Sequence, residues 1–148
     1  MVPLRKMDIR SPKTTKEWEE YYFLRYTVLR KPLGQPIGSE KNEGDLTGKH
    51  FAFFLEKKIV AIARLDPIDS RISQIRFFAV DGKIQGKGFG KILLKEIEKS
   101  AKKRNTEKII LQSRENAVPF YENNGYFTIE KTHLLFGKVQ HYLMEKEL

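Results

Sequence analysis

Residues 77–91 read FFAVDGKIQGKGFGK. An apolar run leads into a glycine-rich turn, and an amphipathic helix is expected to follow the turn. The first amides of a helix have no partners within it, and the helix dipole places partial positive charge there. Glycines let these amides come close to phosphate oxygens, because no side chain stands in the way. The stretch therefore predicts a strand, an anion-binding turn and a helix in succession.

Two common phosphate-binding motifs do not fit the glycine spacing. A Walker A loop needs four residues between its first glycine and its Gly-Lys-Ser/Thr, whereas three residues separate Gly82 from Gly86, and Gly88 follows the lysine. A dinucleotide fingerprint needs Gly-x-Gly-x-x-Gly, and the spacing here is Gly86-x-Gly88-x-Gly90. What remains is Gln85-x-x-Gly88-x-Gly90, for which a plain strand-to-helix turn is the structural alternative.

The apolar pattern on either side of this stretch predicts an α/β fold of the α+β kind. The clearest element is a helix at residues 88–104, whose expected apolar face carries Phe89, Ile92, Leu93, Ile97 and Ala101. Further helices are expected at residues 15–30 and 116–123, with a long loop, or a loop with a short helix, at residues 31–49. Strands are expected at residues 6–10, 50–56, 59–65, 72–80, 109–112, 126–131 and 140–147.

The composition limits the class of protein. The 148 residues are 40% hydrophobic and 32% charged, which predicts a single domain over residues 1–148 with one sizeable core. There are no cysteines, which excludes a disulfide scaffold and a cysteine nucleophile. Neither a signal peptide nor a run of about 20 apolar residues is present, so we expect a cytoplasmic protein with no membrane partner.

The formal net charge of +9 favours anionic partners, such as nucleic acid or a phosphorylated cofactor. No helix-turn-helix, zinc-finger or ribonucleoprotein motif is evident, so nucleic acid is not the expected partner. The densest basic run, at residues 102–104, falls at the end of the expected helix, where the dipole favours positive charge. His50, His133 and His141 lack metal-ligand spacing, so no metal site is expected.

The glycine pattern resembles motif A of the GNAT superfamily of N-acetyltransferases, Arg/Gln-x-x-Gly-x-Gly/Ala. Residues 116–121, which read NAVPFY, and the later Gly125-Tyr126 follow in the family's order. This resemblance covers residues 50–148 and implies a GNAT-like, mostly antiparallel central sheet with splayed strands, flanked by helices. It also implies an enzyme that moves an acetyl group from acetyl-CoA (coenzyme A) to an amine of a small molecule or protein, by direct attack in a ternary complex.

The resemblance further implies which residues bind acetyl-CoA. The amides of motif A would hold the pyrophosphate, and the strand before it would pair with the pantetheine arm in the gap between the splayed strands. Lys87 and Lys91 could add positive charge or be ordinary solvated lysines, and Asn116 could bond the arm or cap a helix. The implied cofactor-binding residues are Phe78, Ala79, Val80, Gln85, Gly86, Lys87, Gly88, Phe89, Gly90, Lys91, Asn116, Phe120 and Tyr121.

Three residues are expected in catalysis. The resemblance implies that the Val80 amide donates to the thioester carbonyl as an oxyanion donor. Tyr121 falls at the family's tyrosine that protonates the leaving thiolate, and the alternative is that Phe120 and Tyr121 are core aromatics. The resemblance names no general base; His141 is the best suited by its pKa, with a structural role as the alternative. Weaker candidates for the base are Asp81, His50 and Glu56.

The sequence does not name the amine acceptor. Residues 136–144 resemble a GNAT branch with Gly-Ile-Pro-His, two further residues and Met, although Val139-Gln140 replaces the Ile-Pro step. Residues 25–36 resemble the acceptor-side helix and loop of the same branch. We expect the acceptor pocket to come from loops at residues 31–49 and 132–140, since such loops differ most between relatives.

Two other functions stay open at this point. One is a catalytically weak acyl-CoA-binding sensor or interaction module, which would keep the cofactor site without turnover. The other is a basic nucleic-acid-binding protein, which would bind duplex DNA in a salt-dependent way. The final strand and its neighbours could also offer an edge for a homodimer.

Overall fold

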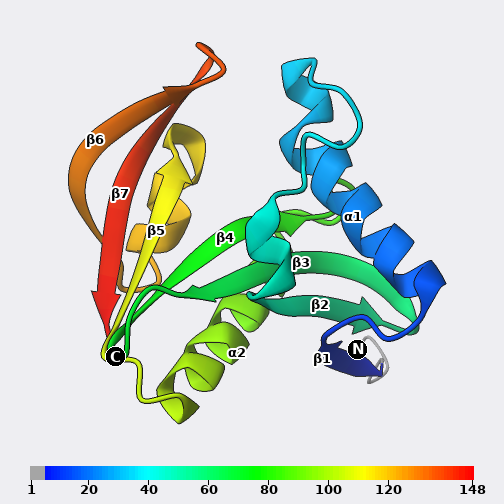
Figure 1. Ribbon diagram of the computed structural model, residues 1–148, viewed down its shortest axis with the longest axis horizontal. Helices are drawn as coiled ribbons and strands as arrows, with labels where there is room; N and C mark the ends of the chain where they lie inside the picture. Colours follow the sequence, from blue (N-terminus) through cyan, green and yellow to red (C-terminus); the bar gives the residue numbers. More distant parts are fainter. Residues whose placement is uncertain (1–5) are drawn as a thin grey trace.

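The computed structural model describes residues 6–148, which form one seven-stranded sheet and the helices that cover it (Figure 1). The strands are β1 (Met7–Arg10), β2 (Lys49–Leu55), β3 (Lys58–Pro67), β4 (Ile72–Val80), β5 (Lys108–Arg114), β6 (Phe127–Leu135) and β7 (Val139–Glu147). They lie in the order β1-β2-β3-β4-β5-β7-β6, and every neighbouring pair is antiparallel except β4 and β5. This confirms the predicted mixed, mostly antiparallel sheet.

The parallel strands β4 and β5 separate after their first few residues. Only Ile72–Ile75 of β4 lie opposite β5, where they meet Lys108–Leu111. A β-bulge follows at once, because Phe77 and Phe78 together lie opposite Ala63 of β3, and Phe77 has a φ of 55°. A bulge bends and twists its strand, and Figure 1 shows β4 and β5 diverging beyond this point. The predicted splay is therefore confirmed.

The two long helices cover opposite faces of the sheet (Figure 1). Helix α1 (Thr15–Leu29) begins where the Thr14 side chain accepts a hydrogen bond from the Glu17 amide, as an N-cap does. Helix α2 (Phe89–Lys103) follows the glycine turn, and the short helix α3 (Val118–Glu122) lies beyond β5. Each long helix buries one side against the sheet: α2 packs on the larger core cluster and α1 on the smaller one.

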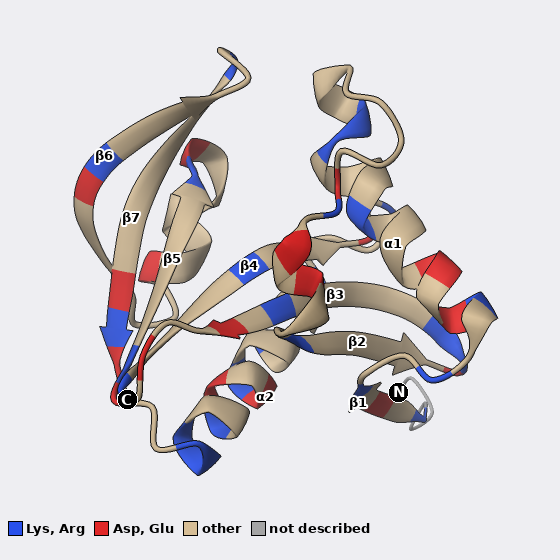
Figure 2. Ribbon diagram, viewed as in Figure 1, with Lys and Arg blue, Asp and Glu red and all other residues tan. Residues whose placement is uncertain are grey.

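The predicted loop at residues 31–49 is held in place by two buried arginines. It contains the short helices η1 (Lys31–Leu33) and η2 (Glu43–Leu46). Arg25 of α1 and Arg64 of β3 are fully buried and share one carboxylate oxygen of Asp45, at 2.8 and 2.7 Å. Asp66 neutralises Arg64 from the other side at 2.7 Å. The acidic η2 therefore lies against β3 (Figure 2), because two buried guanidinium groups need its carboxylate.

The final strand and its neighbours were expected to offer an edge for a homodimer, and β7 itself is not an edge. Strand β7 pairs with β5 on one side and with β6 on the other, so its backbone groups are used within the sheet. The edge on this side is its neighbour β6, whose exposed side chains include Phe127 and Leu134. This arrangement arises because β7 folds back between β5 and β6, which sequence order does not reveal. Within residues 6–148, no helix is long and apolar enough to cross a membrane.

Candidate functional site

The glycine turn before α2 presents a row of backbone amides without acceptors. Gly86 and Gly88 have φ values of 80° and 88°, in the left-handed region that favours glycine. Across residues 6–148, no hydrogen-bond acceptor is found for the amides of residues 85–91. The first amide to bond back is that of Ile92, to the Gly88 carbonyl at 3.2 Å. Such a run of unpaired amides at a helix N-terminus is suited to bind an anion.

The turn is also open on its outer side. A Cβ added at Gly86 or Gly88 would have no heavy atom within 4 Å, whereas one at Gly90 would lie 3.3 Å from the Phe120 ring and 3.4 Å from Val80. The Phe89 ring instead packs edge-on against Phe53 in the core, with centroids 5.6 Å apart. Gly90 thus lets α2 approach α3 and β4, while the earlier glycines leave room for a ligand.

The end of β4 points backbone groups into the gap between β4 and β5. The Asp81 amide donates to the Val60 carbonyl of β3 at 2.9 Å, and neighbouring residues of a strand turn their backbone groups to opposite sides. The amide and carbonyl of Val80 therefore face away from β3, and the Val80 carbonyl indeed accepts from the Gln85 side chain at 3.0 Å. Ala79, two residues before Asp81 and opposite Ile62, turns its backbone groups toward β3 instead.

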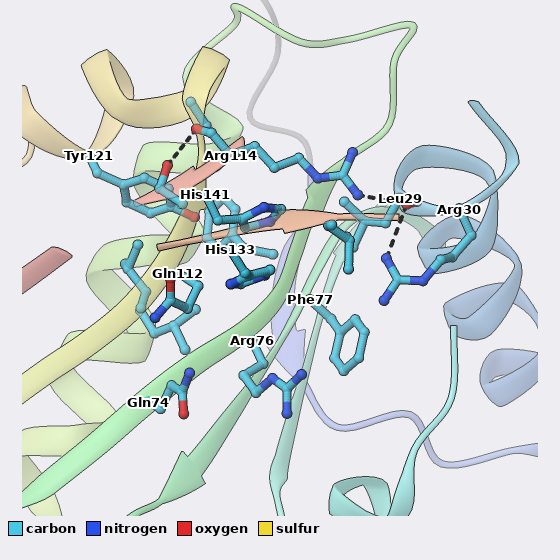
Figure 3. A pocket seen from close by; sticks show the side chains of 16 residues that line it. Leu29, Arg30, Gln74, Arg76, Phe77, Gln112, Arg114, Tyr121, His133 and His141 are labelled. Carbon is cyan, nitrogen blue, oxygen red and sulfur yellow. Dashed lines mark hydrogen bonds between the residues drawn. The ribbon is translucent and has the colours of Figure 1, made fainter. Parts of the chain in front are cut away.

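A cavity of about 200 Å³ opens where the two strands separate (Figure 3). It is formed by the end of α1, the bulged part of β4, the free end of β5, and side chains of α3, β6 and β7. Its lining residues are Leu29, Arg30, Gln74, Ile75, Arg76, Phe77, Phe78, Leu111, Gln112, Ser113, Arg114, Ala117, Tyr121, His133, Leu135 and His141. Phe78, Tyr121 and His141 of the predicted site thus lie around one cavity.

Tyr121 lies in this cavity wall with its hydroxyl unpaired. Its ring packs against Phe78, Phe120 and Tyr126, with centroids 5.1 to 6.0 Å apart. Tyr121 is only 6% exposed, and its hydroxyl makes no hydrogen bond within residues 6–148. Burial raises the pKa of Tyr121 above its usual value, so the phenol keeps its proton. The ring is therefore a core aromatic, as the structural alternative held, and its hydroxyl is still free to act in the cavity.

His141 is held in one tautomer. Its Nδ1 lies 3.0 Å from the Val139 carbonyl, which can only accept, so Nδ1 carries the hydrogen and neutral Nε2 keeps a lone pair. Burial lowers the pKa of His141, the Val139 carbonyl raises it, and His133, Arg114 and Arg30 lower it further. The His133 ring stacks on His141 at 4.5 Å between centroids (Figure 3). His141 is therefore neutral at physiological pH.

Three arginines line the cavity, of which Arg30 lies in the acceptor-side segment 25–36, whereas Arg76 and Arg114 were not predicted. Arg30 follows α1, Arg76 lies at the β4 bulge, and Arg114 ends β5. The Leu29 carbonyl accepts hydrogen bonds from Arg114 at 2.6 Å and from Arg30 at 3.1 Å (Figure 3). Burial lowers the pKa of all three, and neighbouring arginines lower it further. The sequence offers one signal for Arg76, which is the single charged side chain in its strand.

Several sequence candidates lie outside the cavity. His50 bonds Tyr21 at 2.7 Å and the Asp45 carbonyl at 2.8 Å, so both of its ring nitrogens serve the buried cluster. Asn116 is exposed and does not cap α3, whose N-cap is Ala117. Glu56 and Asp81 do not line the cavity either, and neither does any residue of the loop at 31–49. Within residues 6–148, no group of three or more His, Cys, Asp or Glu side chains could hold a metal ion.

The sequence pattern of the acetyltransferase (GNAT) domain matches residues 35–148, which is more than half of the chain. The chain belongs to the GNAT acetyltransferase family. This match confirms the predicted family and begins earlier than the expected stretch at residues 50–148. A curated relative, the uncharacterized N-acetyltransferase YjcF of Bacillus subtilis (strain 168), is 24% identical over 135 residues, which cover 91% of this chain and 96% of the relative.

Solved GNAT structures share the fold over nearly the whole chain. The structure of Escherichia coli ElaA has a TM-score of 0.80 at 18% identity, with 97% of this chain and 100% of that one covered. A GNAT family acetyltransferase from Elizabethkingia anophelis, solved with acetyl-CoA bound, has a TM-score of 0.76 at 16% identity, with 99% of each chain covered. The N-terminal third, where the sequence resemblance was thin, therefore shares the same fold.

Proposed function

We propose that this chain is a single N-acetyltransferase domain that moves an acetyl group from acetyl-CoA to an amine by direct attack in a ternary complex. One observation carries the proposal: the unpaired amides of residues 85–91 lie at the end of the same strand whose separation from β5 opens the cavity. An anion site thus leads into a cavity that holds ionisable side chains. The acetyl-CoA bound in the Elizabethkingia anophelis structure supports this choice of ligand.

The residues fit the chemical groups of acetyl-CoA. The free amides of residues 85–91 would hold its pyrophosphate, with exposed Lys87 and Lys91 adding positive charge. The backbone of Phe78 and Val80 would pair with the pantetheine arm, and exposed Asn116 would bond it from the side of α3. When bound, acetyl-CoA would supply the activated acetyl thioester. The predicted role of Ala79 has the least support, since its backbone faces β3.

Each catalytic role falls to a group that the fold has left free. The Val80 amide faces the gap and would donate to the thioester carbonyl oxygen as negative charge develops there. The Tyr121 hydroxyl would give its proton to the departing sulfur. His141 Nε2, with its lone pair, would take a proton from the attacking amine, directly or through water.

The cytoplasmic location remains a prediction from composition.

We expect the protonation of His141 to affect the pH dependence of kcat/KM. Protonation removes the Nε2 lone pair, and the lowered pKa of His141 keeps the base form at pH values above about 6.5. The amine must also be unprotonated, so log kcat/KM should rise with slope two below the pKa of His141 and with slope one above it. His141→Gln should lower kcat/KM about a hundredfold and leave slope one throughout.

The stacked neighbour gives a matched control. His133→Gln removes one imidazole of the cavity but leaves His141, whose Nδ1 bonds the Val139 carbonyl. The change from slope two to slope one should therefore persist in this variant. If His141→Gln keeps the slope of two, the base is another group.

Thiol release from acetyl-CoA, with a panel of small amines and lysine peptides, tests the proposed function as a whole. We expect amine-dependent release, together with a rise in the thermal midpoint when acetyl-CoA is added. If acetyl-CoA raises the midpoint but no amine releases thiol, the acyl-CoA-binding sensor becomes the better function. If acetyl-CoA does not bind and duplex DNA binds in a salt-dependent way, the nucleic-acid hypothesis replaces both.

A further inference from the structure

The charge of the cavity is one-sided. Its lining residues include Arg30, Arg76 and Arg114 but no aspartate or glutamate. Repulsion from Arg76 lowers the pKa of Arg30, and repulsion from Arg30 lowers the pKa of Arg114. Arg30 and Arg114 are partly buried and Arg76 is exposed. An anion bound among three like charges would reduce their mutual repulsion. The cavity therefore favours a ligand with negative charge.

Arg76 has the most capacity to bind such a ligand. Within residues 6–148, its side chain makes no hydrogen bond and no ion pair. Its guanidinium lies 5.2 Å from the centre of the Phe77 ring, and that of Arg30 lies 5.6 Å from the same ring (Figure 3). Arg30 is only partly used, because its Nε bonds the Ser39 carbonyl and its Nη1 the Leu29 carbonyl. Both guanidinium groups thus flank one ring with donors to spare.

The nearby carboxylates are all engaged elsewhere. Asp45 is shared by Arg25 and Arg64, and both oxygens of Asp66 bond Arg64. Glu40 is buried and accepts from the Gly38 amide at 2.8 Å. The fold therefore neutralises the two arginines that it buries completely and leaves Arg76, beside them, without a carboxylate. Because Arg76 is exposed, water can solvate it in the free protein, and its donors are open to a ligand.

We propose that the amine acceptor carries a second group, a carboxylate or a phosphate, which Arg76 and Arg30 bind while the amine faces His141. A guanidinium pairs with either anion through two parallel N–H donors. The volume of about 200 Å³ is below the roughly 300–1,000 Å³ of drug-sized ligand pockets, so a small amine fits better than a large one. This inference rests on the proposed function, since it names the substrate class of the same site.

Matched pairs of amines test the proposal. Thiol release is compared between 4-aminobutyrate and butylamine, and between O-phosphoethanolamine and ethanolamine, so that each pair differs in the anion. We expect kcat/KM to be about tenfold to hundredfold higher for the anionic member, and the better pair identifies the anion. Arg76→Gln should remove this preference. Arg104→Gln, the same charge change at an exposed residue after α2, should keep it.

A binding measurement separates failure of this inference from failure of the proposed function. Butyrate and inorganic phosphate, which carry no amine, should each be tested for raising the thermal midpoint beyond sodium chloride of equal ionic strength. A rise in wild type and Arg104→Gln, but not in Arg76→Gln, supports the anion site even if no amine releases thiol. Equal rates within both amine pairs, with no rise for either anion, would overturn the inference while thiol release itself stands.

Discussion

Replacing Gly88 with tryptophan is expected to abolish acetyl-CoA binding and, with it, acetyl transfer. Gly88 is the N-cap of α2 with a φ of 88°, and open space surrounds the position of its missing Cβ. An indole there would fill the space in front of the unpaired amides of residues 85–91, which the pyrophosphate needs. Wild type should gain about 2.7 kcal/mol from acetyl-CoA at a hundred times its Kd, a rise of about 5–10 °C. Gly88→Trp should show no rise.

Gly38→Trp is the matched control for this variant. Gly38 also has a positive φ, 103°, and a Cβ there would again have no neighbour within 4 Å, but it lies in the loop after α1. Each substitution should cost about 1–2 kcal/mol of stability, because a non-glycine residue is strained in the left-handed region. Only Gly88→Trp should lose the response to acetyl-CoA. A full response in Gly88→Trp would show that the glycine turn does not hold the cofactor.

The glycine turn was predictable because its signals are local. A strand, a run of glycines and a helix of clear periodicity follow one another within residues 72–104, and each can be recognised without tertiary contacts. Even so, one detail of the predicted helix face was wrong. Leu94 is fully buried and Ile92 is 40% exposed, because the side of α2 that packs on β3 and β4 includes Leu94 and not Ile92. Residues 92–94 are all apolar, so the sequence alone does not determine how α2 is rotated about its axis.

The cavity was not predictable, because it depends on contacts between distant segments. The bulge at Phe77 sets where β4 leaves β5, and nothing in the local sequence marks the residue with positive φ. His133 falls in the segment 132–140 that was expected to be a loop of the acceptor pocket. It lines the cavity from a strand instead, because β6 continues to Leu135 past an irregularity in its pairing with β7. The Arg114 side chain bonds the Leu29 carbonyl of α1 across 85 positions of the sequence, and such a contact has no local sequence signal.

Tyr121→Phe is expected to lower kcat about 10²–10⁴-fold, which is the range that a positioned general acid contributes. Burial raises the pKa of Tyr121, so the phenol is protonated and able to act as an acid at physiological pH. The hydroxyl has no partner to lose within residues 6–148, so its removal should hardly change the free energy of unfolding. Binding of acetyl-CoA, measured by the rise in thermal midpoint, should match wild type.

Tyr126→Phe separates proton donation from packing. Tyr126 belongs to the same aromatic cluster, 5.7 Å from Tyr121, but its hydroxyl donates to Glu98 at 2.8 Å. Removing that hydrogen bond should cost about 1–3 kcal/mol of stability, because the buried Glu98 carboxylate loses a donor, while kcat stays within about twofold. A kcat for Tyr121→Phe within threefold of wild type would exclude the tyrosine as the acid. Water in the cavity would then supply the proton.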